Sequence, residues 1–272
     1  MNMTATADNQ RFQNGARDYA AYFETPKGRL RSDLAFANLK DFLPRPQVMK
    51  SLCALDVGCG TGATGVRLAR LGIHVRLLDS SRSMLDIAKR AAQESGVTDK
   101  VTLQHGDAAQ LATLFPAASF DVILCHNTLE YVDDPVVVLR GVARALRDSS
   151  AILSILVRNQ AGVVFKAAIQ AGDLAAAEHN LTAEWGQESL YGGKVRLFPP
   201  DSLQAMLKEA SLATIAERGV RVLADTCRHK SLAAPSTSGF SSSSGSSAAG
   251  LSMLQSPATR IAWHVALTGD GE

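Results

Sequence analysis

Short apolar runs alternate with helical segments through the middle of the chain. The runs are residues 52–57, 74–78, 101–105, 120–124 and 151–157. The helical segments are residues 62–71, 83–94 and 135–147. Strands that alternate with helices of this length are typical of βαβ units and of a parallel sheet covered on both faces. The pattern predicts an α/β fold built on a central, mostly parallel sheet.

The regions on either side of this alternation have their own patterns. Residues 11–43 look helical, with Leu30, Leu34 and Leu39 on one side, and Pro44 ends the pattern. We therefore expect residues 1–46 to form an N-terminal helical flap before a core of residues 47–230. An alanine-rich insertion near residues 159–198 follows the fifth strand, where acceptor recognition is expected because α/β sites open at the carboxyl ends of strands.

The last third of the sequence adds two predicted strands, which bring the sheet to seven. A helix from about Asp201 precedes a strand over residues 213–223. Residues 231–257 are rich in serine, alanine and glycine, and too few bulky apolar groups remain to repay the entropy of ordering them. We expect a flexible loop there. Residues 258–272 are predicted to supply a strand that closes the sheet edge, and a tail.

Bulk composition narrows the class of protein. At 272 residues and 46% hydrophobic, the chain can bury one catalytic core with an appended element. A net charge of +2 permits nucleic-acid contact without demanding it. The four cysteines lack metal-ligand spacing, so we expect reduced thiols and no metal. No apolar stretch suits a signal peptide or a membrane span, which favours a cytoplasmic protein.

The glycine-rich segment after the first strand carries the strongest chemical signal. Gly58 and Gly60 also satisfy the dinucleotide-binding pattern, so glycine alone is ambiguous. Asp56 favours a different ligand, because a carboxylate there would repel a pyrophosphate but tolerates a sulfonium and an amino group. Cys59 lies inside the same turn. The alternative, a glycine turn without a ligand, is the weaker hypothesis.

Further candidates follow the second and third strands. Asp79 ends the second run about twenty residues beyond the glycines, where an acidic side chain binds ribose hydroxyls of either nucleotide class. Ser80 comes next, and Met84 either lies over an adenine ring or is a core residue behind a serine-capped turn. Asp107, with Ala108 and Ala109, follows the third strand and is placed to accept from an adenine amine.

Two observations complete the cofactor hypothesis. Asp56, Asp79 and Asp107 stand at the ends of three successive strands, which fits S-adenosylmethionine better than a nicotinamide dinucleotide. His126 ends the fourth strand and either contacts the cofactor or supports the structure. Enzymes that methylate exocyclic base amines carry an Asn/Asp-Pro-Pro-aromatic run. The sequence has no such run, so exocyclic base amines are less favoured as acceptors.

From residue 52 to residue 157 the chain resembles the class I S-adenosylmethionine-dependent methyltransferases, whose Rossmann-like fold it is expected to share. A narrower resemblance is to the bacterial enzymes that form a methyl ester on the carboxymethoxy group of the transfer-RNA wobble uridine. The motifs that carry it are Thr25-Pro26-Lys27-Gly28-Arg29-Leu30-Arg31, His126 with Leu129-Glu130-Tyr131-Val132, Arg158-Asn159-Gln160-Ala161-Gly162, and Gly219-Val220-Arg221-Val222. The resemblance implies that Arg31 binds the cofactor carboxylate. It also implies that the other cofactor ligands are Gly58, Cys59, Asp79, Ala108, Ala109 and His126. Asp107 and the serine-rich insert depart from that group.

The mechanism is expected to rest on positioning, because the leaving group of a sulfonium is already activated. No convincing pair of base and orienting residue is evident, and a carboxylate acceptor needs none because it is ionised at neutral pH. Arg158, Arg196 and Arg221 are candidate acceptor ligands, although dispersed surface charge is the plainer interpretation of them. By composition alone Arg31 also belongs to a solvated helix face.

The sequence leaves three functional hypotheses open, and it does not specify the oligomeric state. The first is a methyltransferase acting on the anticodon loop of transfer RNA. The second is a methyltransferase of a small anionic metabolite, and the third is a non-catalytic cofactor-binding or partner-activating subunit. The first requires a wide basic face, the second a closed apolar pocket, and the third an obstructed methyl channel.

Overall fold

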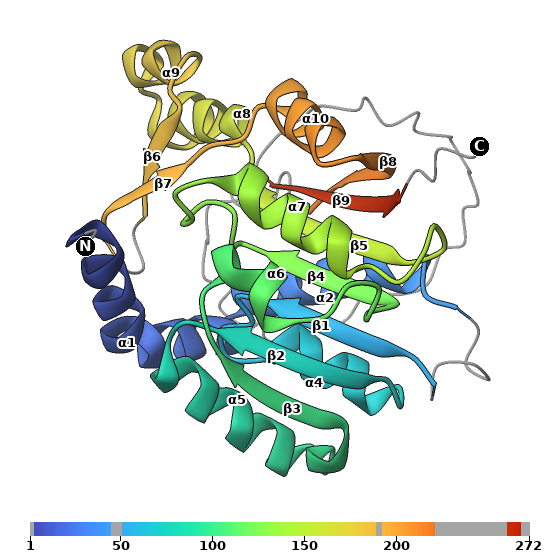
Figure 1. The fold of residues 1–272 in the computed structure, drawn as a ribbon. Coiled ribbons are helices and arrows are strands. Elements are labelled where there is room, and N and C mark those ends of the chain that lie inside the picture. The colour runs from blue at the N-terminus through green and yellow to red at the C-terminus, as the bar shows by residue number, and fades with distance from the viewer. Residues whose placement is uncertain (1–2, 45–50, 189–191, 221–259, 268–272) are drawn as a thin grey trace, which may run out of the picture.

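The computed structural model describes residues 3–44, 51–188, 192–220 and 260–267, and its centre is one sheet (Figure 1). The strand order is β3-β2-β1-β4-β5-β9-β8. Five strands pair in parallel: β1 (Cys53–Val57), β2 (His74–Asp79), β3 (Val101–His105), β4 (Val122–His126) and β5 (Ile152–Arg158). The predicted α/β architecture with a parallel sheet is confirmed.

Two antiparallel strands extend this sheet beyond β5. They are β8 (Leu212–Gly219) and β9 (Arg260–Leu267), and β9 lies between β5 and β8. The prediction that the last strand closes the sheet edge is therefore wrong, because β8 takes the edge. Alternation of apolar and polar residues marks a strand but does not specify its partners, which depend on pairing with distant segments.

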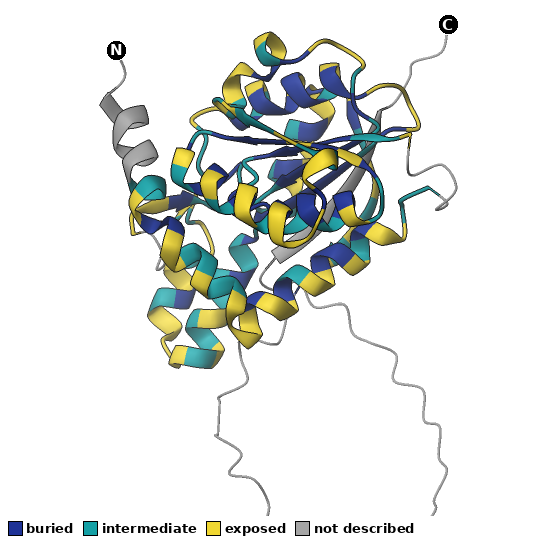
Figure 2. Ribbon diagram, turned by 90° about the horizontal axis from the view of Figure 1, so that it is seen from below, coloured by how far each residue is buried: buried dark blue, intermediate teal, exposed yellow. Residues whose placement is uncertain are grey.

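Helices cover both faces of the sheet, and buried residues gather between the layers (Figure 2). On one face lie α2 (Pro26–Lys40), α4 (Ala63–Arg70) and α5 (Arg82–Glu94), which bury Leu39, Leu68 and Ala88. On the other lie α6 (Leu111–Leu114), α7 (Pro135–Ala145) and α10 (Pro200–Glu209). Burial of these apolar side chains is the main stabilising contribution to the fold.

The N-terminal region, predicted to be helical over residues 11–43, forms two helices. Helix α1 (Met3–Glu24) ends before Thr25, whose hydroxyl accepts from the amide of Gly28 at 3.1 Å and so caps α2. Pro26 begins α2, a position that suits proline because its missing N–H would have no helical partner. The predicted apolar side is also wrong, since Leu30 and Leu34 are 41% and 37% exposed.

The segment after β5 contains more structure than its alanine-rich composition indicated. It holds α8 (Gln160–Phe165), the π-helix η3 (Lys166–Ala171), α9 (Leu174–Asn180) and a hairpin of β6 (Trp185–Gln187) and β7 (Lys194–Arg196). The serine-rich residues 231–257 and residues 221–223 of a predicted strand lie outside the described residues. No helix in the described part of the chain is both long and apolar enough to cross a membrane.

The order of the strands determines where a ligand site can form. The chain leaves β3 at one end of the sheet and returns at β4, beside β1. After β1 it enters α4 on one face, and after β4 it enters α7 on the other face. Connections that diverge in this way leave a crevice at the carboxyl ends of the two strands. The fold therefore places the expected site at the ends of β1 and β4.

Candidate active site

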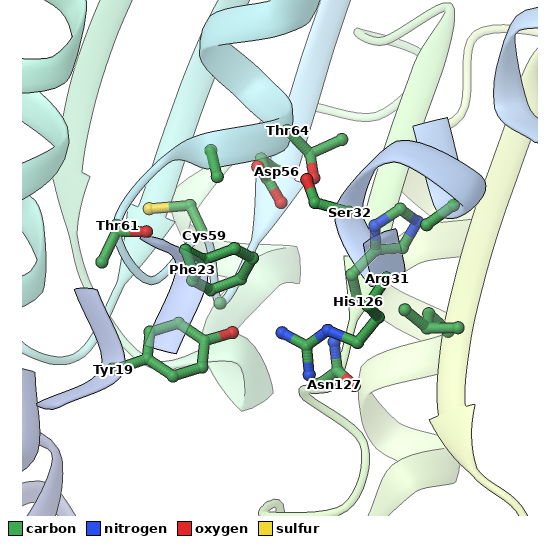
Figure 3. Close-up of a pocket in the computed structure, with 14 residues that line it drawn as sticks. Tyr19, Phe23, Arg31, Ser32, Asp56, Cys59, Thr61, Thr64, His126 and Asn127 are labelled. Carbon is green, nitrogen blue, oxygen red and sulfur yellow. The ribbon is translucent and has the colours of Figure 1, made fainter. Parts of the chain in front are cut away.

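A pocket lies at the ends of β1 and β4, beneath the N-terminal helices (Figure 3). The empty space within it is about 440 Å³, a figure that includes open solvent. The lining residues are Tyr19, Phe23, Arg31, Ser32, Ala35, Asp56, Gly58, Cys59, Thr61, Ala63, Thr64, His126, Asn127 and Leu156. Five predicted cofactor ligands thus meet in one cavity: Arg31, Asp56, Gly58, Cys59 and His126.

The glycine turn between β1 and α4 brings bare backbone to the pocket. Gly58 has a φ of +64°, and a Cβ atom there would lie 2.4 Å from Oγ1 of Thr128. That hydroxyl donates to the carbonyl of Val57 at 2.8 Å, so it is not free to move away. Gly60 lies under Tyr19, whose ring would come within 3.0 Å of an added Cβ. The turn requires glycine at both positions for steric reasons.

Asp56 is the acidic group inside the pocket. Its side chain is buried, with 3% of the residue exposed, and it accepts from the amide of Gly65. Burial, opposed by that hydrogen bond and reinforced by the nearby charge of Asp79, raises its pKa to about 7. A cationic ligand would strongly stabilise this carboxyl group in its ionised form.

Asp79 is buried beside the pocket but does not line it. Its Oδ2 accepts from the amide of Gly60 and its Oδ1 from the amide of Ser81, both at 2.8 Å. Burial nonetheless raises the pKa of this carboxyl above its usual value. The side chain holds the glycine turn against the start of α5, and a carboxylate keeps further acceptor sites for ribose hydroxyls.

Arg31 supplies a cation on the opposite wall. The residue is 5% exposed, and its guanidinium lies 4.9 Å from the ring of Tyr22 and 5.0 Å from that of Phe23. The interpretation of Arg31 as part of a solvated helix face is wrong, because the two aromatic rings of α1 cover it. Its guanidinium and Asp56 give the cavity groups of opposite charge.

The end of β4 places His126 and Asn127 in the pocket. Nε2 of His126 lies 2.8 Å from Oγ of Ser154 on β5. This pair could not be predicted, because the two residues are 28 positions apart and meet only through strand register. Asn127 has a φ of +54° and donates its amide to the carbonyl of Leu156 at 2.7 Å. The pocket thus contains a histidine whose ring contacts a serine hydroxyl, a pair that was not predicted.

The other predicted cofactor ligands lie along the same edge of the sheet but outside this pocket. Met84 is 3% exposed and packs at the start of α5, next to the Ser80 loop. Asp107 accepts from the amide of Ala109 at 2.8 Å and so caps η2 (Ala108–Gln110). Their proposed contacts with an adenine ring stay predictions.

Two of the three arginines expected to bind an acceptor lie in the described residues, and both donate backbone amides to Glu130. Arg158, at the end of β5, forms an ion pair with Glu188. Arg196, on β7, donates to the carbonyl of Asp133 at 3.2 Å and lies 4.7 Å from the ring of Trp185. Arg221 lies outside the described residues. Sequence reasoning missed Tyr19, Phe23 and Asn127 because helical periodicity does not show which face meets a ligand.

Comparison with known proteins identifies the family. Residues 55–154 match the family model described as a methyltransferase domain. The chain is 31% identical over 217 residues to the tRNA 5-carboxymethoxyuridine methyltransferase of Escherichia coli strain K12, covering 76% of this chain and 77% of the relative. This chain belongs to the class I S-adenosylmethionine-dependent methyltransferases.

Other relatives widen the range of acceptors within this family. The methyltransferase is 30% identical over 187 residues to the ubiquinone biosynthesis O-methyltransferase of Hahella chejuensis, covering 66% of this chain and 71% of the relative. A SAM-dependent methyltransferase structure from Thermotoga maritima covers 96% of this chain and 100% of its own, with a TM-score of 0.59 and 17% identity. That likeness shows the fold alone.

S-adenosylmethionine is the cofactor of this methyltransferase, and the pocket chemistry fits it. The cofactor has a carboxylate, an ammonium and a sulfonium, and the cavity offers the guanidinium of Arg31 and the carboxyl of Asp56. Bare backbone at Gly58 allows close approach. When bound, the cofactor supplies an electrophilic methyl group. The three cysteines in the described ranges, Cys53, Cys59 and Cys125, are free thiols.

Proposed function

We propose that this methyltransferase forms a methyl ester on the carboxymethoxy group of the wobble uridine in transfer RNA. The observation that carries the proposal is the 31% identity to the tRNA 5-carboxymethoxyuridine methyltransferase, which extends over three quarters of both chains. Similarity over that length extends well beyond residues 55–154, the part of the chain that the family model covers.

The chemistry of such an acceptor suits a site that works by positioning. A carboxylate is ionised at neutral pH and needs no general base. Its oxygen forms a bond to the methyl carbon while the carbon–sulfur bond breaks, and the electron pair remains on sulfur. The negative charge of the acceptor and the positive charge of the sulfonium disappear together, and no proton moves. Side chains that fix the line of attack supply the acceleration.

Mass spectrometry of nucleosides tests the proposal. Transfer RNA from cells that lack the protein should accumulate the free carboxymethoxy nucleoside and lose its methyl ester, and purified protein should restore the ester. Binding of the RNA should weaken steeply as salt rises, because phosphate contacts release counterions, whereas a small acid would show a shallow dependence. An unchanged nucleoside profile in those cells would refute the proposal.

The second candidate is O-methylation of a small molecule, favoured by the likeness to the ubiquinone biosynthesis O-methyltransferase. A hydroxyl acceptor must lose its proton, so this reaction needs a general base. His126 lines the pocket and lies 2.8 Å from Ser154, which can orient its ring. The pH dependence of turnover therefore distinguishes the two candidates.

A further inference from the structure

A second polar cluster adjoins the cofactor pocket at the end of β5. Leu156 lines the pocket, and Arg158 lies two residues further along the same strand. Side chains two residues apart in a strand point to the same face, with Cα atoms about 7 Å apart. The guanidinium of Arg158 is thus directed to the same side of the sheet as the pocket, one step beyond its wall.

Two donors in this cluster converge on one carboxylate oxygen. The guanidinium of Arg158 donates to Oε2 of Glu188, and the hydroxyl of Tyr131 donates to the same oxygen at 3.1 Å. A second guanidinium nitrogen donates to the carbonyl of Gln187 at 3.2 Å. Only 18% of the Arg158 side chain and 8% of the Glu188 side chain are exposed. The Glu188 carboxylate is therefore almost excluded from solvent, and both of these hydrogen bonds are accepted by its Oε2 rather than its Oε1.

Helix α1 borders both this cluster and the cofactor pocket. The ring of Phe12 packs edge-on against Tyr131 with centroids 5.1 Å apart, and the guanidinium of Arg11 lies 5.1 Å from the Tyr131 ring. Tyr19 of the same helix lines the cofactor pocket. Phe12 and Tyr19 are two turns apart and share a helix face, about 10 Å from one another. One face of α1 therefore lies along both the cluster and the cofactor pocket.

The ion pair of Arg158 and Glu188 is not explained by stability. Desolvation of two largely buried charges offsets most of their attraction, so such pairs stabilise proteins little. Exchange of the Glu188 carboxylate for another carboxylate would keep Arg158 paired and leave the local charge unchanged. A carboxylate of a bound ligand can thus replace that of Glu188 at this site.

We propose that Arg158 and Tyr131 form the carboxylate subsite of the acceptor, and that Glu188 occupies this subsite until the acceptor carboxylate replaces it. The proposal rests on the proposed function in assuming an anionic acceptor. It assigns to Glu188 a role in specificity: only an acceptor that carries its own carboxylate can displace the internal one. The oxygen held by the two donors is anchored, and the other oxygen attacks.

The test compares three variants with the wild type, using an anticodon stem-loop RNA that carries 5-carboxymethoxyuridine. Glu188→Gln should lower KM for the RNA roughly fivefold with kcat nearly unchanged, because a neutral amide competes less well than a carboxylate for Arg158. Tyr131→Phe should raise KM by a similar factor. The double variant Arg158→Gln/Glu188→Gln removes both charges of the ion pair, and it should lose most of its acceptor affinity while keeping its cofactor affinity.

A matched control and a second readout keep the test decisive. The exposed ion pair of Arg140 and Glu209, 2.8 Å apart on α7 and α10, serves as the control, and Glu209→Gln should change nothing. Phenoxyacetate, a small carboxymethoxy compound, should bind the cofactor-loaded Glu188→Gln protein more tightly than the wild type in calorimetry.

The outcomes separate the two proposals. Equal KM values and equal phenoxyacetate affinities for wild type and Glu188→Gln, or a double variant with wild-type KM, would overturn the subsite. Failure of the wild type to methylate any transfer RNA would refute the proposed function alone. In that case the phenoxyacetate titration decides on the subsite, since tighter binding to Glu188→Gln supports it and equal binding overturns it.

Discussion

A Cβ atom on Gly28 would lie 2.1 Å from the carbonyl oxygen of Tyr22. Only glycine therefore allows α2 to begin this close to the end of α1. The same corner is capped by Thr25, which accepts from the Gly28 amide. Arg31 follows Gly28 by less than one turn, and its guanidinium packs on the Tyr22 ring at 4.9 Å. The corner thus aims one buried cation at the pocket.

Gly28→Ala should lower cofactor affinity by roughly tenfold or more. In most helices this change gains up to about 1 kcal/mol, because alanine is the better helix former. Here the methyl group meets backbone that cannot yield without moving one helix against the other, and overpacking of this kind costs about 1–3 kcal/mol. Calorimetric titration with S-adenosylmethionine measures the effect.

Arg29→Ala is the matched control for Gly28→Ala. Arg29 lies on the same helix, but its side chain is 64% exposed and pairs with Glu24 on the surface. Surface ion pairs contribute about 0–1 kcal/mol. Arg29→Ala should therefore keep both the melting temperature and the cofactor affinity of the wild type. A Gly28→Ala protein with unchanged affinity would show that the corner does not control the position of Arg31.

The sequence predicted the elements of this fold better than it predicted its corners. Strands buried on both faces read as continuous apolar runs, and β1, β2 and β5 fall within two residues of their predicted limits. The break at Thr25 was missed although serine or threonine before proline is a helix-start signal. The prediction described residues 11–43 as helical without a break, and the close approach of Gly28 to Tyr22 shows where the chain turns.

Arg31→Ala should weaken S-adenosylmethionine binding by about 1.5–3 kcal/mol if its guanidinium holds the cofactor carboxylate. The compound 5′-methylthioadenosine lacks the amino-acid part of the cofactor and provides a ligand control. Its affinity for wild type and Arg31→Ala should be nearly equal. Equal weakening of both ligands would mean that Arg31 acts by supporting the packing of Tyr22 and Phe23.

Asp56 should make cofactor binding depend on pH. Its pKa in the free protein is raised to about 7, chiefly by burial. A bound cation favours the ionised carboxylate, so binding lowers this pKa and releases a proton below pH 7. Affinity should rise between pH 5.5 and pH 7 and then level off. Calorimetry in buffers of different ionisation enthalpy measures the released proton directly.

Asp56→Asn should abolish the proton release and flatten this profile. The same variant tests stability, because a carboxyl with a raised pKa stabilises the fold when protonated and loses that contribution as pH rises from about 4 through about 7. The cofactor-free wild type should therefore lose more stability than Asp56→Asn over that range. A wild type without proton release at pH 6 would place the cation of the cofactor away from Asp56.

Asp79→Asn should weaken cofactor binding and also loosen the glycine turn. Both carboxylate oxygens accept backbone N–H groups, from Gly60 and Ser81, and an amide can accept through only one of its two terminal atoms. We expect a loss of about 1–3 kcal/mol in the free energy of unfolding from the unsatisfied buried amide. Chemical denaturation of the cofactor-free protein measures this loss. If Asp79 served only to bind the cofactor, the free energy of unfolding would not change.

Site residues within one short sequence motif could be predicted, whereas pairs that are distant in the sequence could not. Gly58 and Asp56 belong to one short segment whose turn chemistry can be read directly. His126 with Ser154, and Arg158 with Glu188, are pairs that form only when strands and the β6–β7 hairpin come together. Their partners lie 28 and 30 positions away. No periodicity in the sequence connects the partners. The sequence alone therefore could not decide whether Arg158 is an acceptor ligand or a dispersed surface charge.

His126→Gln separates a carboxylate acceptor from a hydroxyl acceptor. A carboxylate has no proton to lose, so at saturating cofactor kcat should fall less than about tenfold, and it should stay flat from pH 6 to pH 9. A hydroxyl acceptor needs a base, and removal of that base lowers kcat by roughly 10²–10⁴ and abolishes a pH-dependent rise. Saturation with cofactor is essential, because His126 lines the same pocket and its loss also affects cofactor binding.

Ser154→Ala completes this comparison. Oγ of Ser154 contacts Nε2 of His126 at 2.8 Å, so its removal leaves the ring in place but frees its orientation. With a catalytic base, this variant should keep the pH profile of the wild type at a reduced kcat, because the base is still present. With a carboxylate acceptor, wild type, Ser154→Ala and His126→Gln should share one flat profile. A drop of a hundredfold or more in His126→Gln would therefore favour the small-molecule O-methyltransferase over the transfer-RNA enzyme.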